Sequence, residues 1–480
     1  MGKYICKNCA KEFQQKSHYN VHLTRKIPCE NNSKKIKALV DEEVEKKLKE
    51  LDITNNKVDN KDINNQDEVN PITEPTYSEL SYSLTKQINK EEKQNNGIYF
   101  TPPKTINKSL KLLGPYIDKI KTVLEPACGS CEYINHLDKQ YQGLDITGIE
   151  FNETIYKAIK KFEKSNIKLC NENYLTFDGN KSKMPSTYDL IIGNPPYFVM
   201  KKNEVNKSYH EYFDGRPNIF IMFIIKSLKM LNPGGILMFI LPKNFLNCLY
   251  YDKTRRHIYQ HFKILNIIEC MDSYIETKQE TIILMLENNE NVEHNNQYTL
   301  NINNYTIFGM PDKMKKLKRL YDNSETLSTL KFKVNVGNVV WNQCKDILTD
   351  DETKTRLIYS SDIEKNTLIK KKFENKEKKN HINKEGIREP IIIMNRGYGV
   401  GNYKFEYCLI DGNMEYLIEN HLICVRYTEQ MDKNELLLLY KKIIKSLTNE
   451  KTQQFIDLYF GNNAINTTEL CEIMPMYGMK

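Results

Sequence analysis

Short apolar segments alternate with stretches of helical periodicity from about residue 77 to residue 290. The apolar segments are bounded by glycine, proline or charged residues, which is typical of β-strands. They include KTVLEP (121–126), LDITGIEF (144–151), YDLIIGNPPY (188–197), GGILMFILP (234–242) and ETIILMLE (280–287). Strands that alternate with helices predict a wound α/β sheet, with functional loops where the strands end.

This alternation is lost after about residue 295. Strand-like segments such as EPIIIMNRGYG (389–399) and HLICVRY (421–427) are separated by loops rich in Lys and Asn. NELLLLYKKIIKSL (434–447) has the pattern of an amphipathic helix. We therefore expect an α/β domain over residues 77–295 and a separate α+β domain over residues 296–480.

The residues before these two domains have three different patterns. Residues 1–30 hold closely spaced cysteines and are expected to fold as a unit of their own. Residues 34–51 carry one apolar stripe at helical spacing, which needs a neighbour and allows, without requiring, a homodimer. Residues 52–76 are polar and rich in Asn and Asp, so the segment 31–76 is interpreted as a helix followed by a flexible linker.

Composition excludes several classes of protein. The chain has 480 residues, of which 40% are hydrophobic, and this is too large for a small disulfide-stapled fold. No apolar run reaches the roughly 18 residues that a membrane span needs, and the N-terminus lacks the apolar stretch of a secretory signal. Twelve cysteines without an export signal favour reduced thiols or metal ligands. We expect an intracellular protein without a membrane partner.

The positive charge is concentrated at the N-terminus. Residues 1–37 contain eight Lys and one Arg against two Glu, which is a net charge of +7 out of +8 for the whole chain. This segment is therefore a candidate for contacts with phosphate groups. The rest of the protein must bind a polyanion through local patches.

Three cysteines and one histidine near the N-terminus have the spacing of a metal site. Two residues separate Cys6 from Cys9, twelve lead on to His22, and six more to Cys29. Four nitrogen and sulfur ligands complete the tetrahedral shell of a structural zinc ion. A small core that such a unit needs is supplied by the aromatic residues Tyr4, Phe13 and Tyr19. The pattern resembles the C2H2 and C2HC zinc fingers.

His18 is a competing ligand, although it would shorten the central loop from twelve residues to eight. If the finger docks in the major groove of DNA, its base-reading positions fall on Gln15, His18 and Val21. One finger contacts about three base pairs. We therefore expect it to tether the chain, with protein binding as the alternative role.

The most specific motif in the chain is Asn194-Pro195-Pro196-Tyr197, which directly follows an apolar strand. The two prolines hold the backbone extended and lack N–H groups. The side-chain oxygen of Asn194 and the carbonyl of Pro195 can then both accept hydrogen bonds from one NH2 group. This increases the nucleophilicity of its nitrogen, while the ring of Tyr197 offers a flat face for stacking.

These residues resemble the signature of S-adenosylmethionine-dependent methyltransferases that modify amino groups in planar systems. The resemblance implies a Rossmann-like methyltransferase sheet over residues 77–295, direct transfer of a methyl group without a catalytic metal, and S-adenosylmethionine as cofactor. The family's other motifs follow in order. Residues implied in cofactor binding are Tyr99, Thr101 and Pro102 in GIYFTPP, Glu125, Ala127 and Gly129 in VLEPACGS, Glu150 in GIE, the pair Asn173 and Tyr174, and Asn194 itself.

Two positions depart from the family pattern. Cys131 replaces the second glycine of the cofactor turn, and Asn173 replaces an acid. Either change could weaken cofactor binding, but neither removes a reacting group. Downstream, Asn218 opens a long apolar helix that is expected to end at Asn232. Tyr274 matches the position whose ring stacks the target base from the side opposite Tyr197, with a surface tyrosine as the alternative.

Motif order resembles the gamma class of N6-adenine DNA methyltransferases, the TaqI-like group. The resemblance covers roughly residues 95–480 and implies that residues 296–480 recognise the DNA target. In that region Arg396 and Asn462 are chemically suited to purine edges. Because a base inside a duplex cannot reach such a pocket, the target adenine must flip out and stack against Tyr197.

The function expected from the sequence is thus site-specific N6-adenine methylation of double-stranded DNA. The alternatives are a methyltransferase of RNA adenine or of a protein glutamine with the same motif, or a DNA-binding factor without activity. A cognate restriction endonuclease is a further expected partner. A zinc finger joined to a methyltransferase resembles the arrangement in proteins of large DNA viruses. This implies that the protein is located with viral or host DNA in the cytoplasm or nucleus.

Overall fold

The structure is a computed structural model. It describes Tyr4–Ile5, Glu12–Phe13 and residues 76–480 apart from 181–182, 273, 278, 397–404, 461–464 and 480. The chain divides into two compact units, Met1–Thr73 and Glu74–Lys480. In the first unit, strand β1 (Tyr4–Ile5) pairs antiparallel with β2 (Glu12–Phe13). The candidate zinc ligands Cys6, Cys9, His22 and Cys29 and the expected helix over 34–51 lie outside the described residues.

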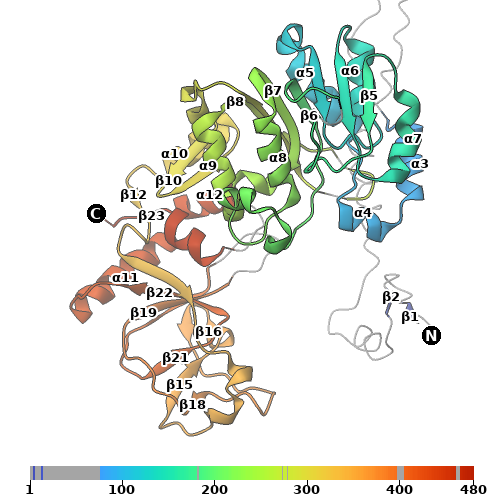
Figure 1. The fold of residues 1–480 in the computed structure, drawn as a ribbon. Helices are drawn as coiled ribbons and strands as arrows, with labels where there is room; N and C mark the ends of the chain where they lie inside the picture. Colours follow the sequence, from blue (N-terminus) through green and yellow to red (C-terminus); the bar gives the residue numbers. More distant parts are fainter. Residues whose placement is uncertain are drawn as a thin grey trace, which may run out of the picture. The chain divides into compact units, whose positions relative to one another are not determined.

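A seven-stranded sheet forms the centre of the second unit, with the strand order β5-β4-β3-β6-β7-β9-β8 (Figure 1). The strands from β5 to β7 are parallel, and β9 is antiparallel to both β7 and β8. Their bounds are β3 Thr122–Glu125, β4 Asp145–Ile149, β5 Ile167–Cys170, β6 Tyr188–Gly193, β7 Leu231–Pro242, β8 Lys263–Cys270 and β9 Thr281–Glu287. The predicted α/β class and its wound, mainly parallel sheet are confirmed.

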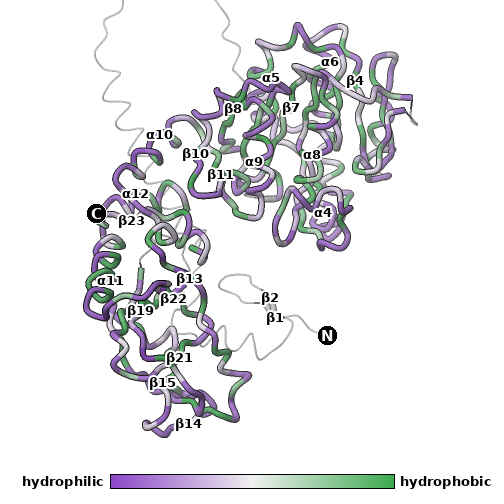
Figure 2. Tube along the Cα trace, turned by 60° about the vertical axis from the view of Figure 1, so that its left-hand side comes forward, coloured by the Kyte–Doolittle hydropathy of each residue, from purple (hydrophilic) through white to green (hydrophobic). Residues whose placement is uncertain are grey.

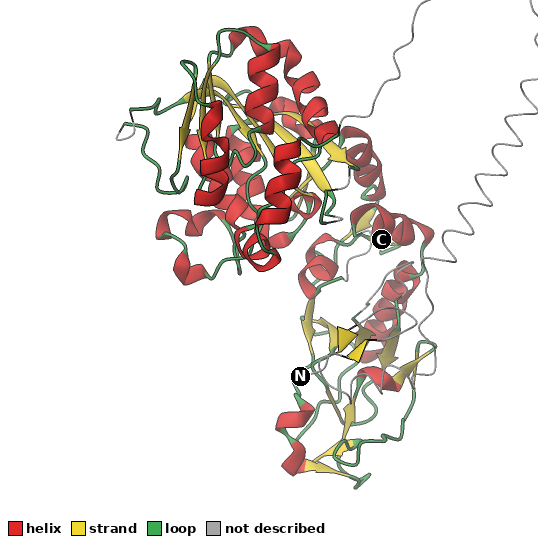
Figure 3. Cartoon of the chain, turned by 90° about the vertical axis from the view of Figure 1, so that its right-hand side faces the viewer, coloured by secondary structure: helices red, strands yellow, loops and turns green. Residues whose placement is uncertain are grey.

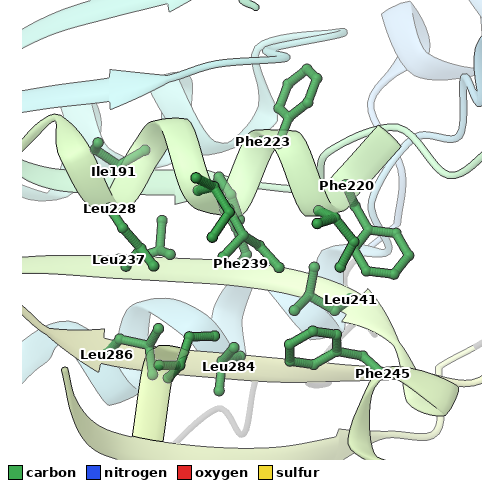
Figure 4. Close-up of a cluster of buried hydrophobic side chains, with 14 of the residues drawn as sticks. Ile191, Phe220, Phe223, Leu228, Leu237, Phe239, Leu241, Phe245, Leu284 and Leu286 are labelled. Atoms are coloured by element: carbon green, nitrogen blue, oxygen red, sulfur yellow. The ribbon is translucent and has the colours of Figure 1, made fainter. Parts of the chain in front are cut away.

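Helices cover both faces of this sheet (Figures 1 and 3). The helices described before β9 are α3 Glu79–Gln87, α4 Lys90–Asn96, α5 Pro103–Leu113, α6 Glu132–Gln140, α7 Glu153–Ile159, α8 Ile219–Lys229 and α9 Asp252–His261, of which α4 contributes to neither core of the sheet. Because side chains alternate along a strand, β7 contributes to two cores. Leu237, Phe239 and Leu241 pack against α8 on one face (Figure 4), whereas Ile236, Met238 and Ile240 face the core shared with α5 and α6.

Smaller sheets and three helices follow from Thr299 onward. One sheet has the order β13-β22-β19-β20 and another the order β14-β18-β15-β21. The strands are β10 Thr299–Ile302, β11 Tyr305–Phe308, β12 Ser324–Glu325, β13 Phe332–Val336, β14 Leu348–Thr349, β15 Thr355–Ile358, β16 Ile363–Glu364, β17 Thr367–Leu368, β18 His381–Ile382, β19 Ile391–Asn395, β20 Tyr407–Ile410, β21 Tyr416–Ile418, β22 Leu422–Tyr427 and β23 Met476–Tyr477. The helices are α10 Pro311–Leu320, α11 Lys433–Leu447 and α12 Glu450–Tyr459. Apolar and polar residues alternate along α11, as the sequence predicts (Figure 2).

A buried arginine joins α9 to the hairpin of β10 and β11. The side chain of Arg255 is fully buried, and its Nε donates to the carbonyl of Thr306 at 2.6 Å. Its Nη1 donates to the carbonyls of Phe245 at 2.9 Å and Cys248 at 2.8 Å. The backbone N–H of Thr306 in turn donates to the carboxylate of Asp252 at 2.7 Å. These contacts fix the segment after β7 against β11.

One expected boundary was wrong. Asn218 caps the N-terminus of α8, as expected, but the helix ends at Lys229 and not at Asn232. Leu231 already pairs with Tyr188 of β6, so the strand pairing begins before the proline at 233 could end the helix. Among the described residues, no helix is both long and apolar enough to cross a bilayer. All nine described cysteines are free thiols.

Candidate active site

Asn194 stands at the carboxyl end of β6, which lies between β3 and β7 in the sheet. Its amide nitrogen donates to the carbonyl of Tyr99 at 3.2 Å. This bond fixes the orientation of the amide, because the nitrogen end is held by the backbone before α5. The oxygen end is therefore available as an acceptor on the other side, which is the orientation that the sequence argument requires.

The hydroxyl of Tyr197 occupies that acceptor. It donates to Oδ1 of Asn194 and also lies 2.8 Å from the carbonyl oxygen of Ile240 in β7. The ring meets Phe220 edge to face, with centroids 6.1 Å apart. Burial raises the pKa of the Tyr197 phenol well above its ordinary value, and the nearby Tyr274 raises it further. The phenol therefore remains a neutral donor at physiological pH.

A cavity of about 510 Å³ opens beside Asn194. Seven residues predicted for the cofactor line it, namely Tyr99, Ala127, Gly129, Glu150, Asn173, Tyr174 and Asn194. Pro196 of the catalytic motif is also in the lining, whereas Pro195 and Tyr197 are not. The volume lies in the range of small-molecule and cofactor sites. The structure thus brings together the strand-end residues that the sequence placed far apart.

Glu150 lies immediately after β4 at the wall of this cavity. Its Oε2 accepts from the backbone N–H of Gly129 at 2.9 Å, and its Oε1 accepts from Asn152 at 2.7 Å. Burial raises the pKa of this carboxyl to about 7, although the backbone donors lower it. Each oxygen keeps a lone pair beyond these bonds, so the carboxylate can accept from ligand hydroxyls. The neighbouring Phe151 is 66% exposed and lines the same cavity.

Asn173 and Tyr174 form the next part of the wall. The Tyr174 ring packs against Phe223 of α8 with centroids 4.9 Å apart, and its hydroxyl bonds Ser227 at 2.8 Å. Oδ1 of Asn173 accepts from the backbone N–H of Leu175 at 2.9 Å. Asn173 stands where the resembled family has an acid. Its Oδ1 is held by the backbone of its own turn and retains one lone pair for a ligand.

The turn after β3 accommodates Cys131 in place of glycine. Cys131 has a left-handed backbone with φ of 61°, its side chain is fully buried, and its N–H donates to the carbonyl of Cys128 at 2.7 Å. A non-glycine residue in this conformation costs roughly 1–2 kcal/mol. Glu125 is also buried, and burial raises its pKa well above the ordinary value. Its Oε2 has no hydrogen-bond partner among the described residues, and the side chain does not line the cavity.

The segment before α5 supports the catalytic motif from the other side. A Cβ on Gly97 would lie 2.6 Å from the backbone nitrogen of Tyr197, so this backbone passes directly against the motif. Thr101 is buried and Pro102 is the N-cap residue of α5. Neither is among the residues that line the cavity.

Several lining residues were missed from the sequence. They are Glu92 and Asn96 of α4, Phe151 and Asn152, and Phe198, Met200, Ile219 and Phe223, whereas Gly97, Ile98 and Phe100, which also line the cavity, belong to the predicted motif GIYFTPP. Glu92 accepts from the Asn152 side chain at 2.8 Å, which joins α4 to the start of α7 beside the cavity. A usable signal existed only for Phe151, an aromatic residue next to the acid that follows β4.

The remaining predicted residues have different outcomes. Tyr274 is buried, so the alternative of a surface tyrosine was wrong, and its hydroxyl has no hydrogen-bond partner among the described residues. Arg396 is half-buried just after β19. Asn462 lies outside the described residues. Within the described part of the chain no cluster of His, Cys, Asp and Glu could hold a metal ion.

Comparison with known proteins gives a consistent assignment for the catalytic segment. "Modification methylase CviBIII" of Paramecium bursaria Chlorella virus NC1A is 31% identical over 186 residues, which are 38% of this chain and 47% of that protein. "Type II methyltransferase M.CvrRI" of Paramecium bursaria Chlorella virus XZ-6E is 24% identical over 407 residues, which are 84% of this chain and 99% of that protein. The chain thus spans about half of the first relative and nearly all of the second.

Among solved structures, the DrdV–DNA complex aligns with a TM-score of 0.45 and 12% identity, covering 83% of this chain and 57% of the other. Residues 78–275 match the model of the family described as "Eco57I restriction-modification methylase". The matched segment contains α3, the turn after β3, the catalytic motif, β7 and Tyr274. Over this segment the chain is similar to the restriction-modification methylases that the family model describes.

Proposed function

We propose that the protein is an S-adenosylmethionine-dependent DNA methyltransferase of the restriction-modification type that methylates N6 of adenine. One observation carries the proposal. The amide of Asn194 is clamped by the Tyr99 carbonyl and offers Oδ1 to a neutral donor at the edge of a 510 Å³ cavity. An acceptor that holds a hydroxyl in this way can hold one N–H of an amino group in the same place.

The residues of the cavity fit the cofactor. Glu150 has lone pairs for the ribose hydroxyls, and Tyr174 and Phe151 provide apolar walls for a flat ring. When bound, S-adenosylmethionine supplies an electrophilic methyl group. Oδ1 of Asn194 and the carbonyl of Pro195 then orient the nucleophile, which is the amino group of the target base.

Asn194 and Pro195 act on the target base. Oδ1 of Asn194 and the carbonyl of Pro195 accept from the amino group, which orients the lone pair of its nitrogen. Oδ1 keeps one lone pair beyond its bond to Tyr197, and we propose that the Tyr197 hydroxyl leaves Oδ1 when its ring turns to stack the base. The rings of Tyr197 and Tyr274 are the proposed faces that stack a flipped adenine.

Residues 296–480 are proposed to recognise the DNA target, in the manner of the gamma class. Arg396 and Asn462 are the proposed contacts to purine edges. The two viral relatives are named as a modification methylase and a type II methyltransferase, which supports methyl transfer, and a cognate endonuclease is a proposed partner. Cys6, Cys9, His22 and Cys29 have the donor set of a structural zinc site and are proposed to hold zinc. We also propose that the protein forms a homodimer through residues 34–51. We propose that it is located with viral or host DNA.

Transfer of a labelled methyl group to duplex DNA tests the proposed function. The purified full chain is incubated with labelled S-adenosylmethionine and, in separate reactions, duplex DNA, RNA or a release factor. We expect labelled DNA, and sequencing of the product should place the methyl group on N6 of adenine. Labelling of RNA or of the release factor alone would overturn the substrate, and no labelling at all would overturn the activity.

Asn194→Ala tests the role of the amide. Because it removes the acceptor and leaves the lining otherwise unchanged, S-adenosylmethionine binding should persist while methyl transfer falls at least about a hundredfold. Asn291→Ala, at an exposed position after β9, is the matched control and should keep wild-type transfer. Near-normal transfer by Asn194→Ala would contradict the assignment.

A further inference from the structure

A second cavity, of about 590 Å³, lies on the side of the sheet where β7 ends. Lys243 directly follows Pro242, the last residue of β7, and belongs to the lining. The hydroxyl of Tyr197 bonds the carbonyl of Ile240 in the same strand. Because β6 and β7 are parallel, Asn194 and this cavity share one edge of the sheet. Gln279 and Glu280, which precede β9, line the cavity as well.

Its walls come from elements far apart in the chain. One wall is the segment Lys243–Asn247, and the others are α10 and the end of α12. Nδ2 of Asn247 donates to the carbonyl of Tyr459 at 2.7 Å, and the hydroxyl of Tyr459 donates back to the carbonyl of Asn247 at 3.3 Å. Together with the Arg255 bonds to Phe245 and Cys248, these contacts hold the first wall in place.

The two lysines of this cavity differ in their partners. Lys243 forms ion pairs with Glu280 at 3.1 Å and with Glu269 at 3.4 Å, so its charge is compensated. Lys313 of α10 is half-buried in the lining, and no described residue forms a hydrogen bond or ion pair with it. Burial lowers the pKa of Lys313, and Lys243 adds to this, while Glu269 and Glu280 oppose it. Lys313 is partly desolvated and makes no hydrogen bond to a described residue, so its ammonium group can donate to an incoming anion.

We propose that this cavity binds a phosphodiester group of duplex DNA close to the target adenine, with Lys313 as its direct ligand. The inference rests on the proposed function, because DNA must pass along the sheet edge that carries Asn194. The apolar floor of Ile307, Phe308 and Leu317 suits the sugar that accompanies a phosphate. Glu280 and Asp457 in the lining disfavour a highly charged anion, whereas one phosphodiester carries a single charge and can accept a hydrogen bond from Lys313.

The salt dependence of DNA binding tests this site. Affinity for duplex DNA falls with salt by a slope of about 0.9 for every phosphate contact. Lys313→Gln should therefore reduce the slope by about 0.9, so that raising salt fourfold weakens the variant about threefold less than the wild type. Lys313→Arg should keep the wild-type slope, since a guanidinium also binds phosphate.

Lys316→Gln is the matched control, because Lys316 lies on the exposed face of the same helix. It should keep the wild-type slope. Melting curves and S-adenosylmethionine binding should be unchanged or improved in Lys313→Gln, which shows that the fold is intact. An unchanged slope in Lys313→Gln, or an equal loss in Lys316→Gln, would overturn the site.

The outcome separates this inference from the function on which it rests. If the wild-type chain neither binds nor methylates duplex DNA, the proposed function fails. If the wild type does both and Lys313→Gln keeps its slope, only the phosphate site fails. A parallel titration with duplex RNA of the same sequence is included, and an equal effect of Lys313→Gln on RNA affinity would overturn the assignment to DNA.

Discussion

The contact between Tyr197 and Asn194 predicts that removing one oxygen atom improves capture of the target base. In the structure the Tyr197 hydroxyl holds Oδ1 of Asn194 and the Ile240 carbonyl. We expect this hydroxyl to leave Oδ1 when the Tyr197 ring turns to stack the base, so the bond opposes capture of the base. Tyr197→Phe keeps the ring for stacking but lacks the bond that stabilises the closed arrangement.

The size of the effect follows from the bond that is lost. A hydrogen bond of this kind contributes about 1 kcal/mol net. Its loss should lower the free energy of opening by about the same amount, which corresponds to about fivefold tighter binding of a flipped base. Tyr274→Phe is the matched control. The Tyr274 hydroxyl has no hydrogen-bond partner among the described residues, so its loss should leave affinity nearly unchanged.

The assay uses a duplex with 2-aminopurine at the methylated position, which sequencing of the product identifies first. Fluorescence of the extruded base is titrated with wild type, Tyr197→Phe and Tyr274→Phe. Equal or weaker capture by Tyr197→Phe would refute the idea that the hydroxyl competes with the base. A drop in methyl transfer of tenfold or more in the same variant would instead give the hydroxyl a direct role in the reaction.

Three further predictions concern Glu150, Gly97 and the N-terminal cysteine Cys9. The pKa of Glu150 is raised from 4.5 to about 7, so the unliganded protein should lose stability as pH rises through this interval. Its melting temperature should fall there, S-adenosylmethionine affinity should rise as the carboxylate forms, and Glu150→Gln should flatten both profiles. Gly97→Ala should cost roughly 1–2 kcal/mol for its φ of 63° and displace the backbone of Tyr197, whereas Gly114→Ala, with open space around it, should be nearly neutral in thermal unfolding and transfer assays. Cys9→Ala should abolish stoichiometric zinc binding in metal analysis but leave methylation of short DNA measurable; loss of all turnover would contradict independent folding of the finger.

Patterns of apolar residues predicted the centre of the sheet but not its edges. The strands β3, β4, β6, β7 and β9 are nearly continuous apolar runs, because both of their faces are covered. The edge strands β5 and β8 contain polar positions such as Lys168 and Asn266, and their weaker pattern gave no clear strand signal. The position of an edge strand depends on the neighbour it pairs with, which a local pattern does not contain.

The candidate site was predictable where residues directly follow strands. Asn194 and Glu150 lie at strand ends, and parallel strands bring such ends together. The inward position of Tyr197 was not predictable, because it depends on Ile240 and Phe220, which come from other elements. Lys313 gave no signal either, since only the packing of α10 next to α12 and the end of β7 makes it a cavity residue.

The bonds of Arg255 bear on how the protein can be divided for expression. A fragment that stops at residue 295 would keep Arg255 and Asp252 but lose the carbonyl and N–H of Thr306 that they bind. Loss of one hydrogen bond to a buried charged group typically costs about 1.5–3 kcal/mol. A truncated catalytic half is therefore expected to be less stable, whereas a cut after the complete β10–β11 hairpin would keep the bonds of Arg255 to Thr306, Phe245 and Cys248.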